Sequence, residues 1–192
     1  MVDRRGFERG QRKWAGLLGE PGFRGQSGGW SRGKPDVAHV FAFWENRVFY
    51  DSFMAREHDR LAAAQSGMYK DMQVKLFECR FDVKTGFEPL FTDADVLRVA
   101  HSRVYEDRVE HFALTQKRVW NPAMAGSPGM LRGVFGEAPG HEFLVLSMWQ
   151  SSAERGKYRP ESLARLSALA QTETDVEALT GDVVQLEASW TV

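Results

Sequence analysis

Residues 40–46 read VFAFWEN, and residues 145–151, which lie 105 positions later, read VLSMWQS. Each stretch is an apolar run that ends in a tryptophan, Trp44 or Trp149, and a polar residue able to cap a helix follows it. A segment rich in Leu and Ala comes next in both places and favours a helix. Both copies therefore predict a strand that leads directly into a helix.

Further landmarks recur in the same order. They are a Gln/Lys/Arg/Trp motif at 11–14 and 116–120, a Pro-Gly motif at 21–25 and 128–133, and a closing alternating strand expected at Val74–Phe81 and Val183–Trp190. Four landmarks in register indicate a tandem duplication of one unit.

Helix and strand patterns follow one order within each half. Residues 7–18 and 109–123 carry apolar residues at three- and four-residue spacing, which is typical of amphipathic helices. Two strands joined by a polar turn come next, followed by a second helix at 47–65 or 152–170 and the closing strand. The second half also has a leading strand, Val96–Val104, which completes βαββαβ, the split βαβ unit of ferredoxin-like folds.

The first half has no full counterpart of this leading strand. Only Met1–Arg5 precede its first helix, and they are too few and too charged. The leading strand is central in a ferredoxin-like sheet, so its loss leaves unpaired backbone groups on both neighbours. We therefore expect either that the natural protein begins upstream of Met1 or that a shortened strand or another segment fills the position.

The predicted organisation is an α+β fold of two ferredoxin-like repeats, at residues 1–82 and 96–192. A linker at 83–95, with Gly86, Pro89 and several Asp residues, joins them. Each repeat has an apolar sheet face that it cannot cover alone, so the two antiparallel sheets are expected to pack against each other.

Composition restricts the partners and the compartment. The net charge is −1, from 25 Lys and Arg against 26 Asp and Glu, which disfavours nucleic acid and anionic lipid as partners. The apolar runs fall far short of the roughly 18 residues of a membrane span, and no secretion signal is recognisable. The single Cys79 cannot form an intramolecular disulfide, which fits a reducing cytoplasm. Aromatic residues make up 12% of the chain and suit the walls of an apolar pocket.

Several motifs of the first half carry a family resemblance: GFRG at 22–25, FAFWEN at 41–46, YDSFM at 50–54 and HD at 58–59. They resemble the antibiotic biosynthesis monooxygenase superfamily, and in particular its uncharacterised YdbC-like branch. The resemblance covers roughly residues 6–80. The second half is similar more loosely, through Pro128-Gly129, Trp149 and the closing strand.

The resemblance implies a fold and a function. In this superfamily, two single-domain chains place their sheets face to face as a dimeric α/β barrel. Here the two halves would do so within one chain, giving a monomeric pseudo-dimer or a homodimer, with a pocket between sheet and helices in each half. Some members oxygenate aromatic compounds without a cofactor. The implied function is therefore a cofactor-independent monooxygenase acting on a small aromatic, polyketide- or quinol-like substrate.

The resemblance also implies catalytic residues. Trp44 stands where the superfamily keeps a tryptophan used in oxygenation, and Tyr50 matches the tyrosine used with it. The asparagine expected four residues before the tryptophan is replaced by Val40 and Val145, and Arg155 stands at the tyrosine position of the second half. In the alternative interpretation, both tryptophans simply anchor a strand to a helix.

Two histidines are further candidates. On a helix facing a pocket, His58 with Asp59 would serve as a general base or as an axial haem ligand. The alternative is a surface histidine among solvated charges, and the matching position of the second half holds Leu163. His101, on the strand Val96–Val104, needs a partner or a pocket, with a hydrogen-bonded core histidine as the alternative.

The predicted catalytic residues are thus Trp44, Tyr50 and His58. The predicted substrate-binding residues are Phe41, Phe43, Phe53, Trp149 and His101. Neither a metal nor a cofactor is expected for this reaction. The alternative functions are a haem-binding or haem-degrading protein and a non-catalytic module that binds small ligands or is associated with stress.

Overall fold

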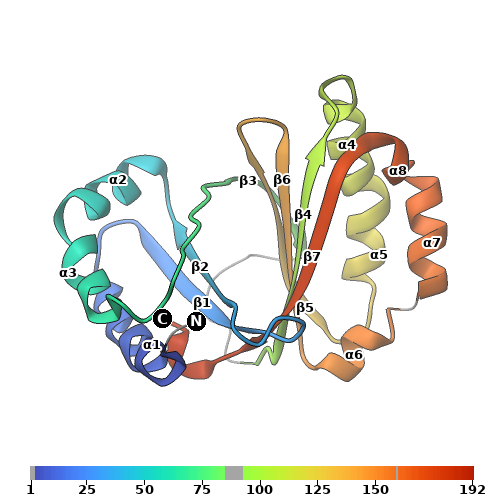
Figure 1. Ribbon diagram of the computed structural model, residues 1–192. Helices are drawn as coiled ribbons and strands as arrows, with labels where there is room; N and C mark the ends of the chain where they lie inside the picture. Colours follow the sequence, from blue (N-terminus) through green and yellow to red (C-terminus); the bar gives the residue numbers. More distant parts are fainter. Residues whose placement is uncertain (1–2, 85–92, 159) are drawn as a thin grey trace. The chain divides into compact units, whose positions relative to one another are not determined.

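The computed structural model describes residues 3–84, 93–158 and 160–192 (Figure 1). Contacts divide the chain into two units. Unit 1 contains Met1–Val74, Glu88–Thr92 and Val184–Val192, and unit 2 contains Lys75–Phe87 and Asp93–Val183. Helices and antiparallel strands in both units confirm the predicted α+β class. Among the described residues, no helix combines the length and the apolar character that a membrane span requires.

From β4 onwards, the elements of unit 2 follow the predicted βαββαβ order. They are β3 (Glu78–Lys84), β4 (Val96–Val104), η3 (Glu106–Arg108), α4 (Val109–Thr115), the π-helical turn η4 (Gln116–Trp120), α5 (Asn121–Ala125), β5 (Met130–Ala138), β6 (Glu142–Trp149), α6 (Ser152–Gly156), α7 (Pro160–Leu169), α8 (Thr172–Asp175) and the first part of β7 (Val176–Leu186). Their strand order is β7-β4-β6-β5-β3, with the leading strand β4 central as predicted.

Helices α4, α5 and α7 lie along one side of this sheet (Figure 1). Beneath α4, Phe112 packs with Val104, Phe135 and Phe143, all buried. The Phe135 and Phe143 rings stack with their centroids 5.3 Å apart. Aromatic rings bury large apolar areas, so this cluster holds the helix on the sheet.

Unit 1 contains the first repeat and the end of the chain. Its elements are α1 (Arg4–Gln11), η1 (Arg12–Leu17), β1 (Phe23–Ser31), β2 (Ala38–Trp44), α2 (Arg47–Arg56), α3 (His58–Ala62), η2 (Ala63–Gln65), the end of β7 and η5 (Ala188–Trp190). Strands β1 and β2 form an antiparallel hairpin from Phe23↔Trp44 to Trp30↔Ala38.

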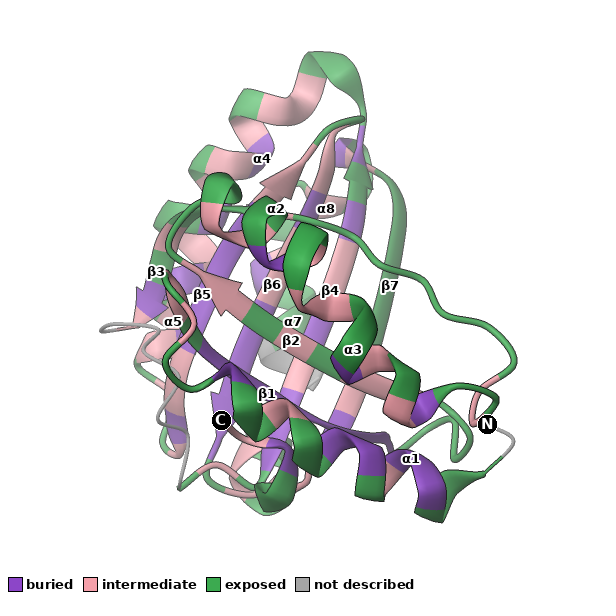
Figure 2. Ribbon diagram, turned by 90° about the vertical axis from the view of Figure 1, so that its left-hand side faces the viewer, coloured by how far each residue is buried: buried purple, intermediate pink, exposed green. Residues whose placement is uncertain are grey.

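The C-terminal residues line the other edge of β1. Gly29 pairs with Leu186, and Gln26 exchanges two backbone hydrogen bonds of 3.0 Å with Val192. A Cβ on Gly29 would lie 1.8 Å from the Gln185 carbonyl oxygen, so only glycine permits this approach. Strand β1 is consequently buried over most of its length (Figure 2).

Side chains cap the second helix of each half as the sequence predicts. The Asn46 side chain accepts a hydrogen bond of 3.2 Å from the Phe49 amide, and Ser151 accepts one of 3.1 Å from the Glu154 amide. Each cap satisfies an otherwise unpaired donor at a helix N-terminus.

Strand β2 keeps an open edge in unit 1. Among the described residues, it pairs with β1 alone, whereas its counterpart β6 pairs with both β5 and β4. No shortened strand or other described segment fills the place of the missing leading strand. Burial reflects this difference, because β2 is exposed or half-buried where β1 is buried (Figure 2).

The closing strands also differ from the prediction. The first was expected at Val74–Phe81, but β3 begins at Glu78, and residues 71–77 have no strand structure. The second was expected at Val183–Trp190, but β7 spans Val176–Leu186. By the 105-residue offset, 71–77 correspond to the part of β7 beside β4. Among the described residues, no strand stands beside 71–77 as β4 stands beside β7. Most of the expected linker, at 85–92, lies outside the described residues.

Candidate functional site

An aromatic cluster in unit 1 is centred on Phe53 of α2. The buried Phe53 ring stacks on Trp44 at 5.0 Å and contacts Trp14 of η1 at 6.4 Å and His58 of α3 at 6.1 Å. Tyr50 meets the Trp44 ring edge-on at 6.2 Å. We call Trp14, Trp44, Tyr50, Phe53 and His58 the Phe53 cluster.

Local geometry explains why these side chains meet. Tyr50 and Phe53 lie three residues apart, on one face of α2. Trp44 ends β2 only two residues before the N-cap Asn46, so its ring is carried towards the start of that face. The predicted catalytic residues Trp44, Tyr50 and His58 thus share one cluster with the predicted binding residue Phe53.

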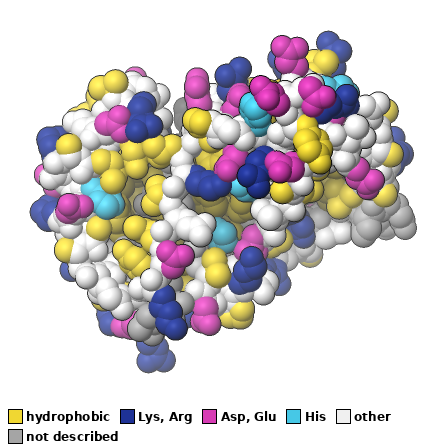
Figure 3. Space-filling view, turned by 45° about the horizontal axis from the view of Figure 1, so that its top comes forward, with side chains coloured by type: hydrophobic (Ala, Val, Ile, Leu, Met, Phe, Trp, Pro, Cys, Tyr) yellow, Lys and Arg dark blue, Asp and Glu magenta, His cyan; other side chains and the backbone are white. Residues whose placement is uncertain are grey.

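The cluster is partly accessible. Phe53 is buried, but Trp14, Trp44, Tyr50 and His58 are only half-buried. Figure 3 shows hydrophobic side chains reaching the surface of unit 1, at the left of the picture, with Lys and Arg interspersed among Asp and Glu. Part of each of these four side chains is therefore exposed to solvent.

His58 is oriented by its neighbours. Its Nδ1 lies 3.0 Å from a carboxylate oxygen of Asp59, whose side chain is fully exposed. Water screens this pair, which therefore orients the imidazole more than it stabilises the protein. In the tautomer whose Nδ1–H donates to Asp59, Nε2 carries the lone pair. Trp14 and Phe53 pack against the same ring at 5.9 and 6.1 Å.

A buried amide network supports the cluster from behind. Gln65 accepts a hydrogen bond of 3.0 Å from Trp14 Nε1 and donates one of 3.1 Å to the Phe7 carbonyl. Gln11 links Gln65 to Gln26, which in turn donates to the Trp190 carbonyl. The residue-by-residue predictions missed Trp14 and Gln65. The recurring motif at 11–14 was the available signal, because it contains both Gln11 and Trp14.

Phe41 and Phe43 lie on the other face of β2. Successive side chains of a strand alternate between faces, so both point away from the face that carries Trp44. Phe41 stacks on His39, with ring centroids 6.1 Å apart. The structure therefore does not bring these two predicted binding residues into the Phe53 cluster.

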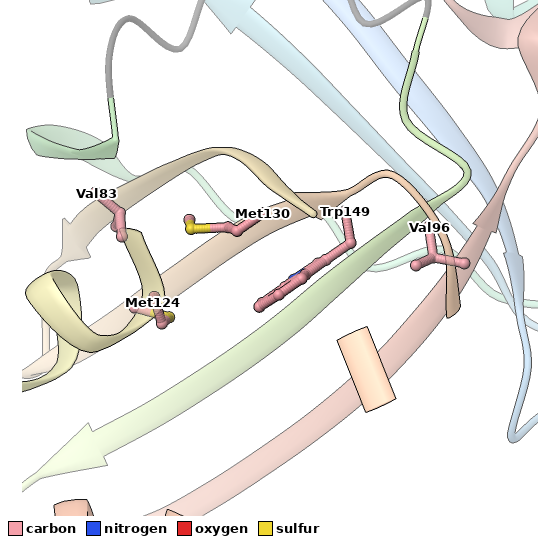
Figure 4. Close-up of a cluster of buried hydrophobic side chains, with 5 residues drawn as sticks. All are labelled: Val83, Val96, Met124, Met130 and Trp149. Atoms are coloured by element: carbon pink, nitrogen blue, oxygen red, sulfur yellow. The ribbon is translucent and has the colours of Figure 1, made fainter. Parts of the chain in front are cut away.

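Trp149 is a core residue of unit 2. It is 2% exposed and packs with Val83, Val96, Met124 and Met130 (Figure 4). Its Nε1 donates a 3.0 Å hydrogen bond to the Ser147 hydroxyl. These side chains fill the space between β6 and α5, where the resemblance implied a pocket. Trp149 thus has the contacts of the packing anchor that the alternative interpretation describes.

Unit 2 contains a tryptophan–tyrosine contact that the sequence did not reveal. Tyr158 lies nine residues after Trp149, and their rings are 6.0 Å apart. Its buried hydroxyl has no hydrogen-bond partner among the described residues. Burial raises the pKa of Tyr158 to about 12, so the phenol is neutral at physiological pH.

His101 has the satisfied environment of the alternative interpretation. Its Nε2 lies 2.9 Å from Glu142, whose carboxylate also accepts a 2.5 Å hydrogen bond from Lys75. The Phe77 ring meets the imidazole edge-on. The hydrogen bond from Lys75 holds the pKa of Glu142 below its usual range, partly offset by desolvation and supported by the bond to His101.

We expect Glu142→Gln to destabilise the protein in a pH-dependent way. The folded-state pKa of Glu142 is depressed below its usual value of 4.5, so its stabilising contribution is complete above that value. It is lost as pH falls through the folded-state pKa. Urea midpoints of both proteins, measured from neutral pH to about pH 3, should therefore converge at the acid end. A difference that stays constant at all pH values would contradict the assignment.

Comparison with known proteins relates the first half to a bacterial protein. Residues 2–77 match the family described as a domain of unknown function, DUF4937. The uncharacterised protein YdbC of Bacillus subtilis (strain 168) is 34% identical over 76 residues, covering 38% of this chain and 64% of YdbC. The chain therefore spans less than two thirds of this relative. The family match over residues 2–77 includes all five residues of the Phe53 cluster.

Solved structures share the fold of the whole chain. A proposed monooxygenase from Fusobacterium nucleatum subsp. nucleatum ATCC 25586 superposes with a TM-score of 0.76 at 9% identity, covering 95% of this chain and 85% of that chain. A second, from Lactobacillus acidophilus NCFM, has a TM-score of 0.69 at 15% identity, with coverages of 99% and 91%. An anthrone oxidase-like protein has a TM-score of 0.65 at 12% identity, with coverages of 100% and 89%. These structures confirm that the chain shares the fold of proteins named as monooxygenase-like, and the sequence match to YdbC confirms the predicted likeness of the first half to that protein.

Proposed function

We propose that the Phe53 cluster is the active site of a cofactor-independent monooxygenase that acts on a small aromatic, polyketide- or quinol-like substrate. One observation carries this proposal: an oriented imidazole and a half-buried indole both contact the buried Phe53 ring in unit 1, and a phenol contacts the same indole. The fold shared with monooxygenase-like proteins supports it. The name of the anthrone oxidase-like neighbour supplies a first substrate to test.

The proposed reaction needs only one base and a binding surface. His58 Nε2 removes one proton from the activated methylene of the substrate, and the resulting carbanion adds to O2 as a peroxide anion, which the protonated imidazole then protonates to the hydroperoxide. The O–O bond breaks as His58 removes the second methylene proton, and the departing hydroxide takes up that proton. One oxygen atom stays in the new carbonyl and the other leaves as water, so the substrate methylene supplies both hydrogens of that water. General base catalysis of this kind contributes about 10²- to 10⁴-fold.

The other cluster residues position the substrate. The half-buried indole of Trp44 presents a planar surface on which an aromatic ring can stack. The Tyr50 ring lies beside Trp44, and in this proposal its hydroxyl donates a hydrogen bond to the oxygen of a bound phenol or ketone. Gln65 fixes the Trp14 ring, which packs on His58. Holding the reacting carbon near a fixed base lowers the barrier through proximity.

We expect His58→Gln to lower the rate of O2 consumption with anthrone or a hydroquinone by at least about 100-fold. Glutamine preserves hydrogen bonding but cannot take up the proton. Oxygen-electrode assays would measure the rate. His141→Asn, in the left-handed turn between β5 and β6, is the matched control and should keep the wild-type rate. Equal rates for His58→Gln and the wild type would contradict the role of His58.

We expect Trp44→Phe to separate function from packing. Trp44 is half-buried, so the smaller ring should cost less than about 1.5 kcal/mol of unfolding free energy. The rate of O2 uptake should fall clearly while the melting temperature changes little, because the stacking surface for the substrate shrinks. Thermal melts and O2 uptake, measured on the same samples, decide the point. A sharp fall in melting temperature would identify Trp44 as a packing anchor instead.

A haem-binding function is the second candidate. The contact between His58 Nδ1 and Asp59 favours it, because ligating histidines commonly donate their other ring nitrogen to a carboxylate. Haem held by His58 Nε2 would supply O2 chemistry of its own. Titration with haemin would then give a Soret band that His58→Ala abolishes. Aromatic ligand binding without O2 uptake or haem binding would instead indicate a non-catalytic module.

A further inference from the structure

The outer edge of β2 lacks the usual protection of an edge strand. Its seven residues, AHVFAFW, contain no proline and no Asp, Glu, Lys or Arg. Natural edge strands are normally blunted by such residues, because bare backbone groups invite pairing with another strand. An unprotected edge of this length indicates a place where a strand is received.

Backbone geometry shows which residues would receive it. The Val37 carbonyl accepts a hydrogen bond from Ser31, and the Glu45 amide donates to the Gly22 carbonyl, so odd-numbered residues turn their backbone groups towards β1. In an antiparallel ladder, the intervening residues point the opposite way. Val40 and Ala42 therefore present their N–H and C=O groups at the outer edge.

The second repeat contains the filled version of this position. There, β4 pairs along the outer edge of β6, with Val96 opposite Trp149, Leu97 opposite Met148 and Val99 opposite Leu146. Transferred by 105 residues, the same strand would place its apolar residues opposite Trp44, Phe43 and Phe41. The repeat thus specifies the orientation, the register and the residue pattern of the occupant.

Trp149 and Trp44 differ in burial because β4 pairs with β6 beside Trp149, whereas no described strand pairs with the outer edge of β2 beside Trp44. In unit 2, Val96 is fully buried beside Trp149, which is 2% exposed. In unit 1, Trp44 is half-buried, and no described residue stands in the position of Val96. A docked strand would cover the Trp44 ring and so close one side of the Phe53 cluster.

A second segment, at residues 71–77, has the matching deficiency. In unit 2 the neighbour of β4 on its other side is β7. Residues 71–77 correspond to the start of β7 but form no strand, and Met72 and Val74 are 56% and 64% exposed. Alternating exposed apolar residues are typical of a strand that lacks its neighbour.

We propose that the outer edge of β2 is a docking site for an extended β-strand with the alternating apolar pattern of Val96–Val104. The strand pairs antiparallel to β2 and shields Trp44, so it would compete with a ligand that stacks on that ring. Binding of the strand is measured without substrate and does not require the Phe53 cluster to be catalytic.

A synthetic peptide of residues 95–104, DVLRVAHSRV, tests the proposal on the full chain. It should bind saturably at one copy per chain, raise the melting temperature and shift tryptophan emission to shorter wavelength. The emission shift should be absent in Trp44→Phe, although binding persists. A peptide carrying Ala100→Pro, which lacks the N–H that would pair with Val40, should bind at least about 10-fold more weakly.

Variants of β2 locate the site. Val40→Pro removes an outward N–H but leaves the odd-numbered residues paired with β1, so it should abolish peptide binding. Val40→Lys, which adds a charge to the edge, should weaken binding. It tests the same position without proline, in case Val40→Pro does not fold. The proposal would be overturned if the peptide failed to saturate, or if both variants bound it as tightly as the wild type does. A wild-type dimer that the same variants dissociate would also overturn it, because the occupant would then be a second copy.

Discussion

Trp190→Ala should lower the free energy of unfolding by about 3–5 kcal/mol. Trp190 is fully buried near the end of the chain, and its ring meets those of Phe7 at 5.5 Å and Trp30 at 5.3 Å. Alanine would leave a cavity between α1 and β1 that the surrounding rings fill only in part. Urea unfolding followed by far-ultraviolet circular dichroism would measure the loss.

Two control variants separate the cavity from a general effect of substitution. Leu18→Ala, at a 70% exposed position, should change stability by less than about 0.5 kcal/mol. Trp190→Phe should cost much less than alanine, because the indole N–H has no hydrogen-bond partner among the described residues. A Trp190→Ala midpoint equal to that of Leu18→Ala would show that the C-terminal segment does not hold unit 1 together.

Asp175→Ala should destabilise the protein by about 3 kcal/mol. The Asp175 carboxylate is fully buried and binds the Arg108 guanidinium and His111 Nδ1, each at 2.7 Å. Removing it leaves the partly buried Arg108 without its opposing charge. The ion pair joins η3 and α4 to the end of α8, directly before β7, so its loss should loosen this side of unit 2.

Urea is the appropriate denaturant for Asp175→Ala, because guanidinium chloride would screen the ion pair. The exposed pair of Arg103 and Glu177, at 3.0 Å, provides the control. Glu177→Ala should cost less than about 1 kcal/mol. If Asp175→Ala and Glu177→Ala lowered the free energy of unfolding equally, the burial of Asp175 would not strengthen its ion pair.

Local patterns predicted much of the fold. The 105-residue repeat, the order of helices and strands, and the caps Asn46 and Ser151 were all readable, because each depends on residues close together in sequence. The neighbours of each strand were less readable. Alternation identifies a strand but not its partner, so neither the contact between Gln26 and Val192 nor the late start of β3 could be foreseen.

The candidate site was predictable only in part. Trp44 and Trp149 have nearly the same local sequence, yet one is half-buried and the other lies in a core. The difference comes from β4, which lies more than 40 residues before Trp149 and has no described equivalent beside Trp44. The contact between Trp14 and His58 likewise joins segments 44 residues apart, beyond the reach of any periodicity.

The two tryptophans also divide the two halves by role. Both indoles border a tyrosine, but Trp149 is buried among aliphatic and methionine side chains and hydrogen-bonded to Ser147. Trp44 is half-buried and lies in one cluster with an oriented imidazole. Chemistry is therefore expected in unit 1, while the corresponding part of unit 2 supplies stability.

Incorporation of isotopic oxygen tests the proposed reaction most directly. Anthrone would be incubated with the wild type or His58→Gln under ¹⁸O2, and the quinone analysed by mass spectrometry. We predict that the wild type forms quinone carrying one ¹⁸O atom much faster than buffer does, and that His58→Gln approaches the buffer rate. Wild-type protein that forms labelled quinone no faster than buffer would contradict the proposed oxygenation of anthrone.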